Sequence, residues 1–335
     1  MKILIKVLVS TVVFFYFQAC SNSGTQFALP QMSTQSAGQI TYNNKVDILF
    51  VVDNSKSMLQ YQQRLAAKVS DMITTLNSLG MDYHIAVTTT TMSTNTANYP
   101  MARQLVGSPV YLNAQNINQL SNRIIVGEAG SDLERGLDAM RLVTSASYLT
   151  SIGSDFLLSD ALFAVIFISD EQDQSSEFGN PNSNDFVNYL NGIKPPFENG
   201  SRAWIANYIG ILTNKSCDNL GGFVSIGTQF INLVDVSKGI KSSICNADLS
   251  EAVSNIKSRI VDQLTTFPFA QTPNKSTIKV TVGNRTIIED PVNGWTIQTE
   301  VNAQGQSVSL LKFHGTSIPA ANEPVTIDYK PAGAI

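Results

Sequence analysis

Three segments of the sequence are almost continuously apolar over the length of a buried strand, and they constrain the fold more than any other feature. They span residues 46–52, 163–168 and 204–212 and are rich in Val, Ile, Phe and Leu. Strands that are apolar on both faces are typical of a parallel sheet covered by helices on each side. Around them, apolar residues three or four apart predict amphipathic helices over 57–79, 132–143 and 249–264, and a further strand is expected over 83–89. This alternation predicts an α/β fold with a doubly wound, mostly parallel sheet.

The sequence pattern changes after about residue 275. Segments at 278–282, 296–301, 307–313 and 325–329 alternate apolar and polar residues, with Gly, Asn or Pro between them. A period of two is typical of strands that bury one face. We therefore expect an α/β domain over 45–266, followed by a small antiparallel, β-sandwich-like module over 275–332.

The N-terminus has the features of a targeting segment. Lys2 precedes an apolar stretch over 3–17, and Lys6 lies near its start. The stretch has the length of the apolar core of a signal peptide and is short for a membrane-spanning helix. The Ala19–Cys20 pair that follows resembles the lipobox of bacterial lipoproteins, in which the signal is cut before the cysteine and the cysteine is acylated. The alternative is an ordinary secretory peptide with an incidental cysteine.

The lipobox resemblance implies a signal peptide over 1–19, a lipid anchor at Cys20 and a location in the bacterial cell envelope. Ser21 favours the outer membrane, and the protein would face the periplasm or the cell surface. Residues 20–44 are rich in Ser, Thr, Gln, Asn and Gly, so we expect a flexible tether there.

Two cysteines remain after Cys20, at positions 217 and 245. In an exported chain an even number of cysteines predicts a disulfide, here between Cys217 and Cys245, with two free thiols as the alternative. The net charge of −4 argues against nucleic-acid binding. With only 2 histidines and scattered cysteines, neither a zinc site of the usual type nor histidine-based catalysis is expected.

Carboxylate and hydroxyl side chains follow two of the apolar strands. Asp53, Ser55 and Ser57 come directly after the first strand in an Asp-x-Ser-x-Ser pattern, and Asp170 follows the strand at 163–168. Because the carboxyl ends of parallel strands meet at one edge of a sheet, these side chains should lie close together. Hard oxygen ligands of this kind suit Mg²⁺ or Mn²⁺, and the sequence therefore predicts a divalent metal site. Taken alone, the first motif could also be a metal-free helix cap.

The order of these motifs resembles the von Willebrand factor type A (vWA) domain, whose metal-ion-dependent adhesion site (MIDAS) takes ligands from three loops. Ser131 stands where that family usually has threonine, five residues before Gly136. The resemblance implies that an ion, expected to be Mg²⁺ with Mn²⁺ or Ca²⁺ as alternatives, is held by Asp53, Ser55, Ser57, Ser131 and Asp170. Segments 53–58, 169–175 and 243–245 further resemble bacterial lipoproteins that join such a domain to a C-terminal β module.

Other polar residues have simpler interpretations. We interpret Glu171 and Asp173 as solvated loop acids, with tuning of the metal site or binding of a second ion as the alternative, and His84 as a core or sheet-edge residue. Glu134 is expected in the first turn of a helix, where an acid favours the helix N-terminus. A supporting role beside the metal is the alternative for Glu134.

Two functions fit these features. The first is a membrane-anchored adhesion or scaffold protein, in which an Asp or Glu of a protein partner completes the coordination of the ion. The second is a metal-assisted hydrolase acting on a cell-envelope or phosphate substrate. The chain shows no nucleophile–base motif and no phosphate-binding glycine loop, so we expect binding rather than catalysis.

Overall fold

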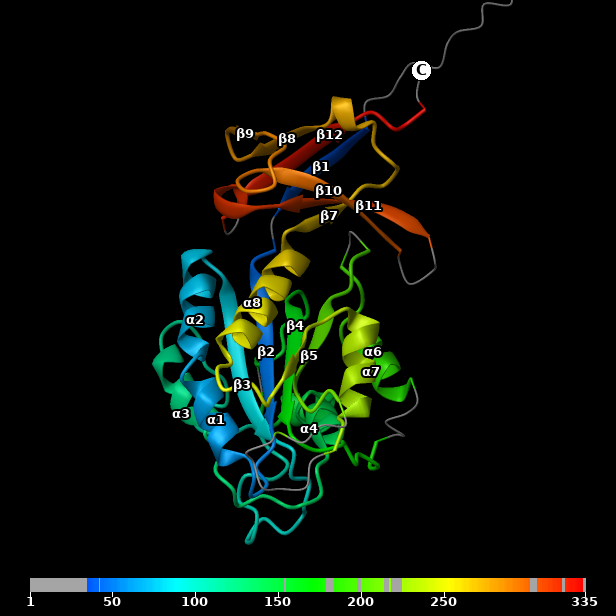
Figure 1. The fold of residues 1–335 in the computed structure, drawn as a ribbon. Coiled ribbons are helices and arrows are strands. Elements are labelled where there is room, and N and C mark those ends of the chain that lie inside the picture. The colour runs from blue at the N-terminus through cyan, green and yellow to red at the C-terminus, as the bar shows by residue number, and fades with distance from the viewer. Residues whose placement is uncertain are drawn as a thin grey trace, which may run out of the picture.

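The computed structural model describes residues 35–41, 43–153, 155–178, 184–197, 200–213, 217, 225–301, 306–320 and 323–333 of the 335-residue chain. The expected signal segment and Cys20 lie outside these residues. The described chain forms an α/β part and, next to it, an antiparallel β module (Figure 1).

A five-stranded parallel sheet in the order β3-β2-β4-β5-β6 forms the centre of the α/β part. The strands are β2 (Lys45–Val52), β3 (Asp82–Thr89), β4 (Leu162–Ser169), β5 (Trp204–Gly210) and β6 (Lys241–Ser243). From β2 the chain first adds β3 on one side, and then crosses to add β4, β5 and β6 on the other. The direction of winding therefore reverses between β2 and β4, which is where open α/β sheets bind their ligands.

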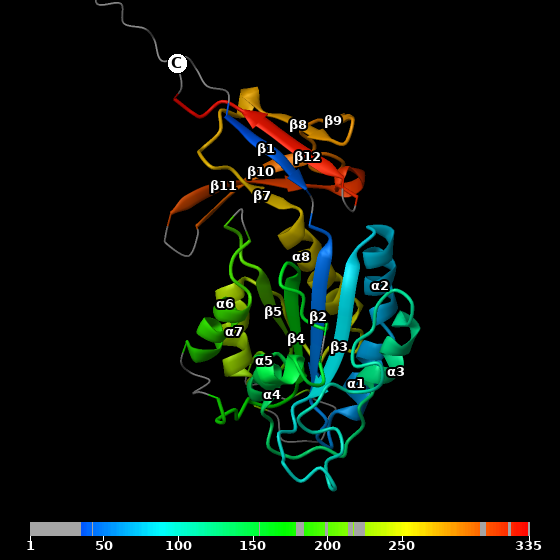
Figure 2. The same cartoon turned by 180° about the vertical axis from the view of Figure 1, so that it is seen from behind.

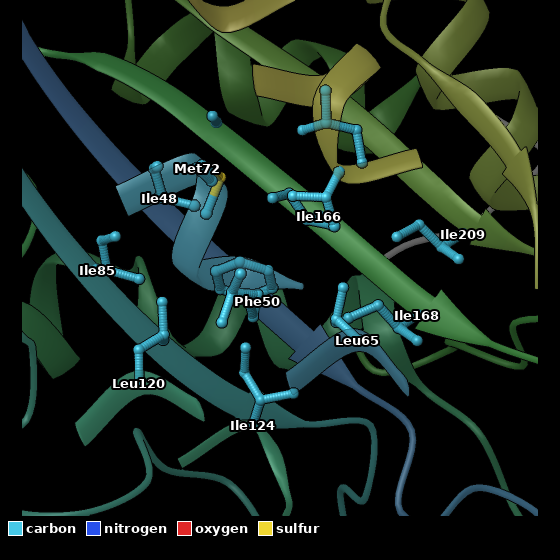
Figure 3. Close-up of a cluster of buried hydrophobic side chains, with 14 of the residues drawn as sticks. Ile48, Phe50, Leu65, Met72, Ile85, Leu120, Ile124, Ile166, Ile168 and Ile209 are labelled. Atoms are coloured by element: carbon cyan, nitrogen blue, oxygen red, sulfur yellow. The ribbon is translucent and has the colours of Figure 1, made fainter. Parts of the chain in front are cut away.

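Helices cover both faces of this sheet (Figures 1 and 2). One face packs against α1 (Leu59–Ala66), α2 (Val69–Ser78), α3 (Leu120–Ile124) and α8 (Ser250–Leu264). The other packs against α4 (Gly136–Val143), α5 (Ala146–Leu149), α6 (Asp185–Ile193) and α7 (Thr228–Ser237). Alternate residues of β2 enter the two cores, with Phe50 among the first group of helices (Figure 3) and Leu49 among the second. The apolar strands are thus buried on both sides, as the sequence predicts.

The module consists of two antiparallel sheets around one core. One sheet has the order β1-β12-β8-β9 and the other the order β10-β11-β7. Its strands are β7 (Thr266–Pro268), β8 (Lys279–Val282), β9 (Arg285–Ile287), β10 (Trp295–Val301), β11 (Ser307–Phe313) and β12 (Pro324–Tyr329). Trp295, Phe313 and Tyr329 are buried between the sheets, which gives the module a sandwich-like core.

The remaining strand of the module comes from the segment predicted to be a tether. Residues Gln35–Thr41 form β1, which pairs with β12 in antiparallel register from Gln35↔Tyr329 to Thr41↔Pro324. The tether prediction is therefore wrong for residues 35–41. Their polar composition is compatible with an edge strand, because such a strand pairs with one neighbour only and makes its ladder bonds through the backbone.

Two helix boundaries differ from the prediction, whereas the predicted disulfide is present. The helix predicted over 57–79 is divided at Ala67–Lys68 into α1 and α2, and the helix predicted to begin at 132 begins at Gly136. The predicted disulfide is confirmed, since Cys217 and Cys245 are bonded with their Cα atoms 5.1 Å apart. Within the described ranges, no helix combines the length and apolar character needed to cross a membrane.

Candidate functional site

The site predicted from the sequence lies at the carboxyl ends of β2 and β4, where the winding of the sheet reverses. Asp53 is the first residue after β2, and its backbone N–H donates to the carbonyl of Ile168 in β4 at 2.9 Å. Asp170 is the first residue after β4. The two carboxylates are therefore placed at one edge of the sheet by strands that are direct neighbours.

A tight turn after β2 fixes Asp53 and gathers the two hydroxyls of the motif. Asp53 is fully buried, and its Oδ1 accepts a hydrogen bond from the backbone N–H of Ser55 at 2.8 Å. The Ser169 hydroxyl donates to Asp53 Oδ2 at 2.6 Å. The hydroxyl oxygens of Ser55 and Ser57 are 3.4 Å apart. Burial raises the pKa of Asp53, and the hydrogen bonds from Ser169 and Ser55 oppose that rise.

Asp170 brings a second buried carboxylate to this turn. It is 1% exposed, and its Oδ1 is buried without a hydrogen-bond partner. Burial and, after it, the charge of Asp53 raise the pKa of Asp170 to about 6, against the opposing effect of the Ser57 hydroxyl. These mutual influences place Asp53, Ser57 and Asp170 in one cluster.

Ser131 belongs to a loop that is joined to the same turn. The backbone N–H of Gly130 donates to the carbonyl of Asn54 at 2.8 Å, and the Thr91 hydroxyl donates to the Asn54 side chain while accepting from the N–H of Ser131. A Cβ atom at Gly130 would lie 2.5 Å from the Asn54 carbonyl, so only glycine permits this approach. The Ser131 hydroxyl itself accepts from the backbone N–H of Leu133 at 3.1 Å.

Glu134 is the residue of this site whose position the sequence did not predict. It is fully buried, its carboxylate oxygens lack close hydrogen-bond partners among the described residues, and the Thr90 hydroxyl and the Asp53 carboxyl are near enough to affect its pKa. Burial raises its pKa, and the negative charge of Asp53 is the next largest cause. Because α4 begins at Gly136, Glu134 precedes the helix and does not lie in its first turn, so that interpretation is wrong.

The two loop acids that follow Asp170 differ from each other. Asp173 is 2% exposed, so its interpretation as a solvated acid is wrong. It accepts from the backbone N–H of Leu137 and from Ser175, and thereby holds the start of α4 against the loop. Glu171 is half-buried, and burial together with the charges of Asp53 and Asp170 raises its pKa to about 7.

The carboxylates of the cluster lack compensation by positive side chains. No Lys or Arg of the described chain forms an ion pair with Asp53, Glu134 or Asp170. Buried carboxylates are costly unless they are paired, protonated or bound to a metal. The unpartnered oxygens of Asp170 and Glu134 therefore fit a site for a cation.

The donor set also agrees with the expected class of metal. Carboxylates and serine hydroxyls are the hard oxygen ligands that Mg²⁺, Mn²⁺ and Ca²⁺ prefer. Among the described residues, no group of three or more His, Cys, Asp or Glu side chains is arranged to hold a metal on its own. The predicted set instead combines two carboxylates with three hydroxyls, and such a set needs the serines of both loops.

Comparisons with known proteins give only distant likenesses. No protein-family model matches the sequence, and no curated protein matches it. The pilus adhesin SpaC from Lactobacillus rhamnosus GG, in its open conformation, is similar over 85% of this chain with 13% identity and a TM-score of 0.40. Proximal thread matrix protein 1 from the mussel byssus is similar over 69% of this chain with 14% identity and a TM-score of 0.38. The likenesses cover 38% of the SpaC chain and 51% of the mussel chain, and they are too distant to bear on function.

Proposed function

We propose that the α/β part is a vWA domain that binds a partner protein through a divalent metal ion at the edge of its sheet. The observation that carries this proposal is the pair of buried carboxylates, Asp53 and Asp170, at the point where the winding reverses. Asp170 Oδ1 has no partner, and no positive side chain of the described chain is paired with either residue. A bound cation would compensate both.

The ion, with Mg²⁺ expected and Mn²⁺ or Ca²⁺ as alternatives, would be held by the residues that the sequence motifs indicate: Asp53, Ser55, Ser57, Ser131 and Asp170. Two carboxylates nearly neutralise a divalent ion without saturating its coordination. An Asp or Glu side chain of the partner can then bind the ion without strong repulsion from the protein. The ion would thus supply the attraction, and the surrounding loops would supply selectivity.

An adhesion or envelope-scaffold role follows if the chain is also anchored at Cys20. The apolar segment at 3–17 and the Ala19–Cys20 pair support this part of the proposal, and both lie outside the described residues. Acylation of Cys20 would hold the binding domain at a membrane surface. Replacing Cys20 with Ala should move the protein from the membrane fraction to the soluble exported fraction, and unchanged membrane retention would contradict the anchor.

The metal-dependent interaction can be tested with the full chain as bait. Envelope and host-surface proteins are captured in Mg²⁺ by wild type and by Asp53→Ala, and the capture is repeated in EDTA. Because ion and partner share one coordination sphere, partners should be lost both in EDTA and with Asp53→Ala. Capture that survives both treatments would refute a metal-dependent interface. Turnover of a phosphate or sugar substrate that requires Asp53, without a stable partner, would instead support the hydrolase.

A further inference from the structure

The two most exposed large apolar side chains of the described residues lie in one turn of the β module. Ile288 is 70% exposed and Val292 is 67% exposed. The turn that carries them is held firmly. Asp290 Oδ1 accepts the backbone N–H groups of Val292 and Asn293, each at 2.7 Å, and the N–H of Trp295 donates to the carbonyl of Ile288. Large apolar side chains that a fixed turn holds together in solvent are typical of a contact surface.

Ile288 belongs to the outer face of the sheet β1-β12-β8-β9. Along β9, Ile287 is buried in the module core, so Thr286 and Ile288 on either side of it point to the opposite face. Lys279, exposed at the start of β8, is level with Ile288, because Val280 pairs with Ile287. Figures 1 and 2 show this sheet on the side of the module that is away from the α/β part. The outer face is therefore at the opposite end of the molecule from the proposed metal site.

The described chain enters the module at the same end of this sheet. Gln35 pairs with Tyr329 at the end of β12, and the registers of β12 with β8 and of β8 with β9 place Ile288 at that end as well. Gln35 is 15 residues after Cys20. A chain of that length reaches at most about 50 Å when it is fully extended. An anchor at Cys20 would therefore keep the module nearer to the bilayer than the metal site.

The two parts of the chain also differ in net charge. Residues 45–265 carry 15 Lys and Arg against 21 Asp and Glu, a formal net charge of −6, whereas residues 266–335 carry 5 of each and are neutral. A bilayer with anionic lipids repels a negative protein surface and attracts lysines. Lys279 and Lys330 of the module form no ion pair within the described chain. Charge therefore favours the module, and not the α/β part, as the side that faces the bilayer.

We propose that the outer face of this sheet, together with the turn at 288–292, is a docking surface for the phospholipid bilayer that holds the anchor at Cys20. Ile288 and Val292 enter the boundary between headgroups and acyl chains, and Lys279 and Lys330 meet the lipid phosphates. Docking fixes the orientation of the protein, so that the metal site points away from the membrane toward a partner. This inference rests on the anchor in the proposed function and does not depend on the metal ion.

The test uses full-length acylated protein in vesicles of phosphatidylethanolamine and phosphatidylglycerol that contain a lipid with a quencher on its headgroup. A fluorescent probe is attached to a cysteine introduced by Thr286→Cys, beside the turn, or by Ile152→Cys, after α5 of the α/β part. The apolar pair is removed from the Thr286→Cys protein by Ile288→Ser with Val292→Ser. The matched control is Ile152→Ser with Val236→Ser, at positions that are 55% and 42% exposed.

The probe at residue 286 should be quenched about twofold or more as strongly as the probe at residue 152, because only a docked face lies at the level of the headgroups. Ile288→Ser with Val292→Ser should reduce the quenching at 286 to the level at 152. The control pair should leave the quenching at 286 unchanged. Asp53→Ala should leave it unchanged as well, since docking does not use the metal site.

Three results would overturn the docking surface. Equal quenching of the two probes, or unchanged quenching at 286 after the apolar pair is removed, would refute it and leave the proposed metal site standing. A dimer of the soluble chain that Ile288→Ser with Val292→Ser dissociates would assign the turn to a second copy instead of the bilayer.

Failure of the anchor can be distinguished from failure of the docking surface. If the chain carries no acyl group, the anchor is wrong, and flotation of the soluble full chain with the same vesicles decides the docking surface. Co-flotation that Ile288→Ser with Val292→Ser abolishes would support it, and absence of co-flotation would refute it.

Discussion

Two aspartates on the same strand lie at opposite ends of the sheet, and their surroundings differ. Asp47 and Asp53, near the start and just after the end of β2, are both fully buried. Asp47 Oδ2 accepts the backbone N–H of Leu158 at 2.7 Å. Lys194, 1% exposed, donates to the carbonyl of Leu158 at 2.6 Å, and its positive charge acts on Asp47. At Asp53 the neighbouring ionisable groups are acids.

The difference between the two surroundings indicates that Asp47 has a structural role and that Asp53 belongs to a binding site. Burial raises the pKa of Asp47, and the Leu158 N–H and Lys194 oppose that rise. At this end the chain provides basic side chains of its own: Lys194 holds the loop around Leu158, and His84 Nδ1 lies 3.6 Å from Asp47 Oδ1, which has no hydrogen-bond partner among the described residues. At the other end the negative charge is left for a cation from solution, as expected for a binding site rather than a structural element.

The largest expected effect tests the compensated end. Lys194→Met removes a buried positive charge that lowers the pKa of Asp47, and it removes the donor to the carbonyls of Leu158 and Ser159. We expect the free energy of unfolding to fall by about 2–3 kcal/mol, as measured by urea denaturation in EDTA. Lys56→Met, at an exposed lysine beside the metal site, is the control and should change little. A similar small change for both variants would show that Lys194 does not compensate Asp47.

A smaller effect of opposite sign is expected at the other end. Asp53→Asn removes one of the carboxylate charges that no positive side chain of the described chain pairs with, but its amide oxygen can accept only one of the hydrogen bonds from Ser55 and Ser169, so the metal-free protein should become more stable by only about 1 kcal/mol. The same variant should lose the increase in melting temperature that Mn²⁺ gives to wild type. The measurement is thermal unfolding in EDTA and in Mn²⁺. A clear loss of stability in EDTA would mean that Asp53 is compensated after all.

The smallest expected effect concerns His314 in the β module, a half-buried side chain that stays uncharged to a lower pH in the folded protein. Burial and then the positive charge of Lys312 lower the pKa of His314, whose Nε2 lies 2.7 Å from the Thr296 hydroxyl. A lowered pKa in the folded state means that stability is fully present above the unfolded value and is lost as the pH falls through the folded one. Urea denaturation at decreasing pH below about 6.5 should show a slightly steeper loss for wild type than for His314→Gln. Parallel curves would show that His314 titrates alike in both states.

The sequence predicted the features that depend on local pattern. Continuous apolar runs identified β2, β4 and β5, and the residue after each of the first two strands gave Asp53 and Asp170. Period-two alternation identified β8, β10, β11 and β12. The spacing of apolar residues along each of these elements depends on whether it buries one face or both. That spacing is visible within a few neighbouring residues of the sequence.

The features that the sequence did not predict depend on distant parts of the chain. β1 is polar and becomes a strand because β12, nearly 300 residues later, offers it a backbone edge. Glu134 is buried because Thr90 and Gln174 hold its backbone from two sides. No local pattern distinguishes it from a surface acid near a helix. Glu134 stands two residues before Gly136, where the buried face of α4 begins. This spacing indicates a buried position only when the sheet edge against which α4 starts is known.

The placement of β1 has a mechanical consequence. β1 ends at Thr41, β2 begins at Lys45, and Asp53 follows the end of β2 (Figure 2). A pull between an attachment upstream of Gln35 and a partner held at Asp53 would load these two strands in series. Hydrogen bonds in a sheet lie perpendicular to its strands, so such a load would shear the β1–β12 ladder as a whole rather than open it bond by bond. The disulfide and the buried core cluster of the module lie outside these two strands, so tension would reach the site mainly along backbone that the strands already extend.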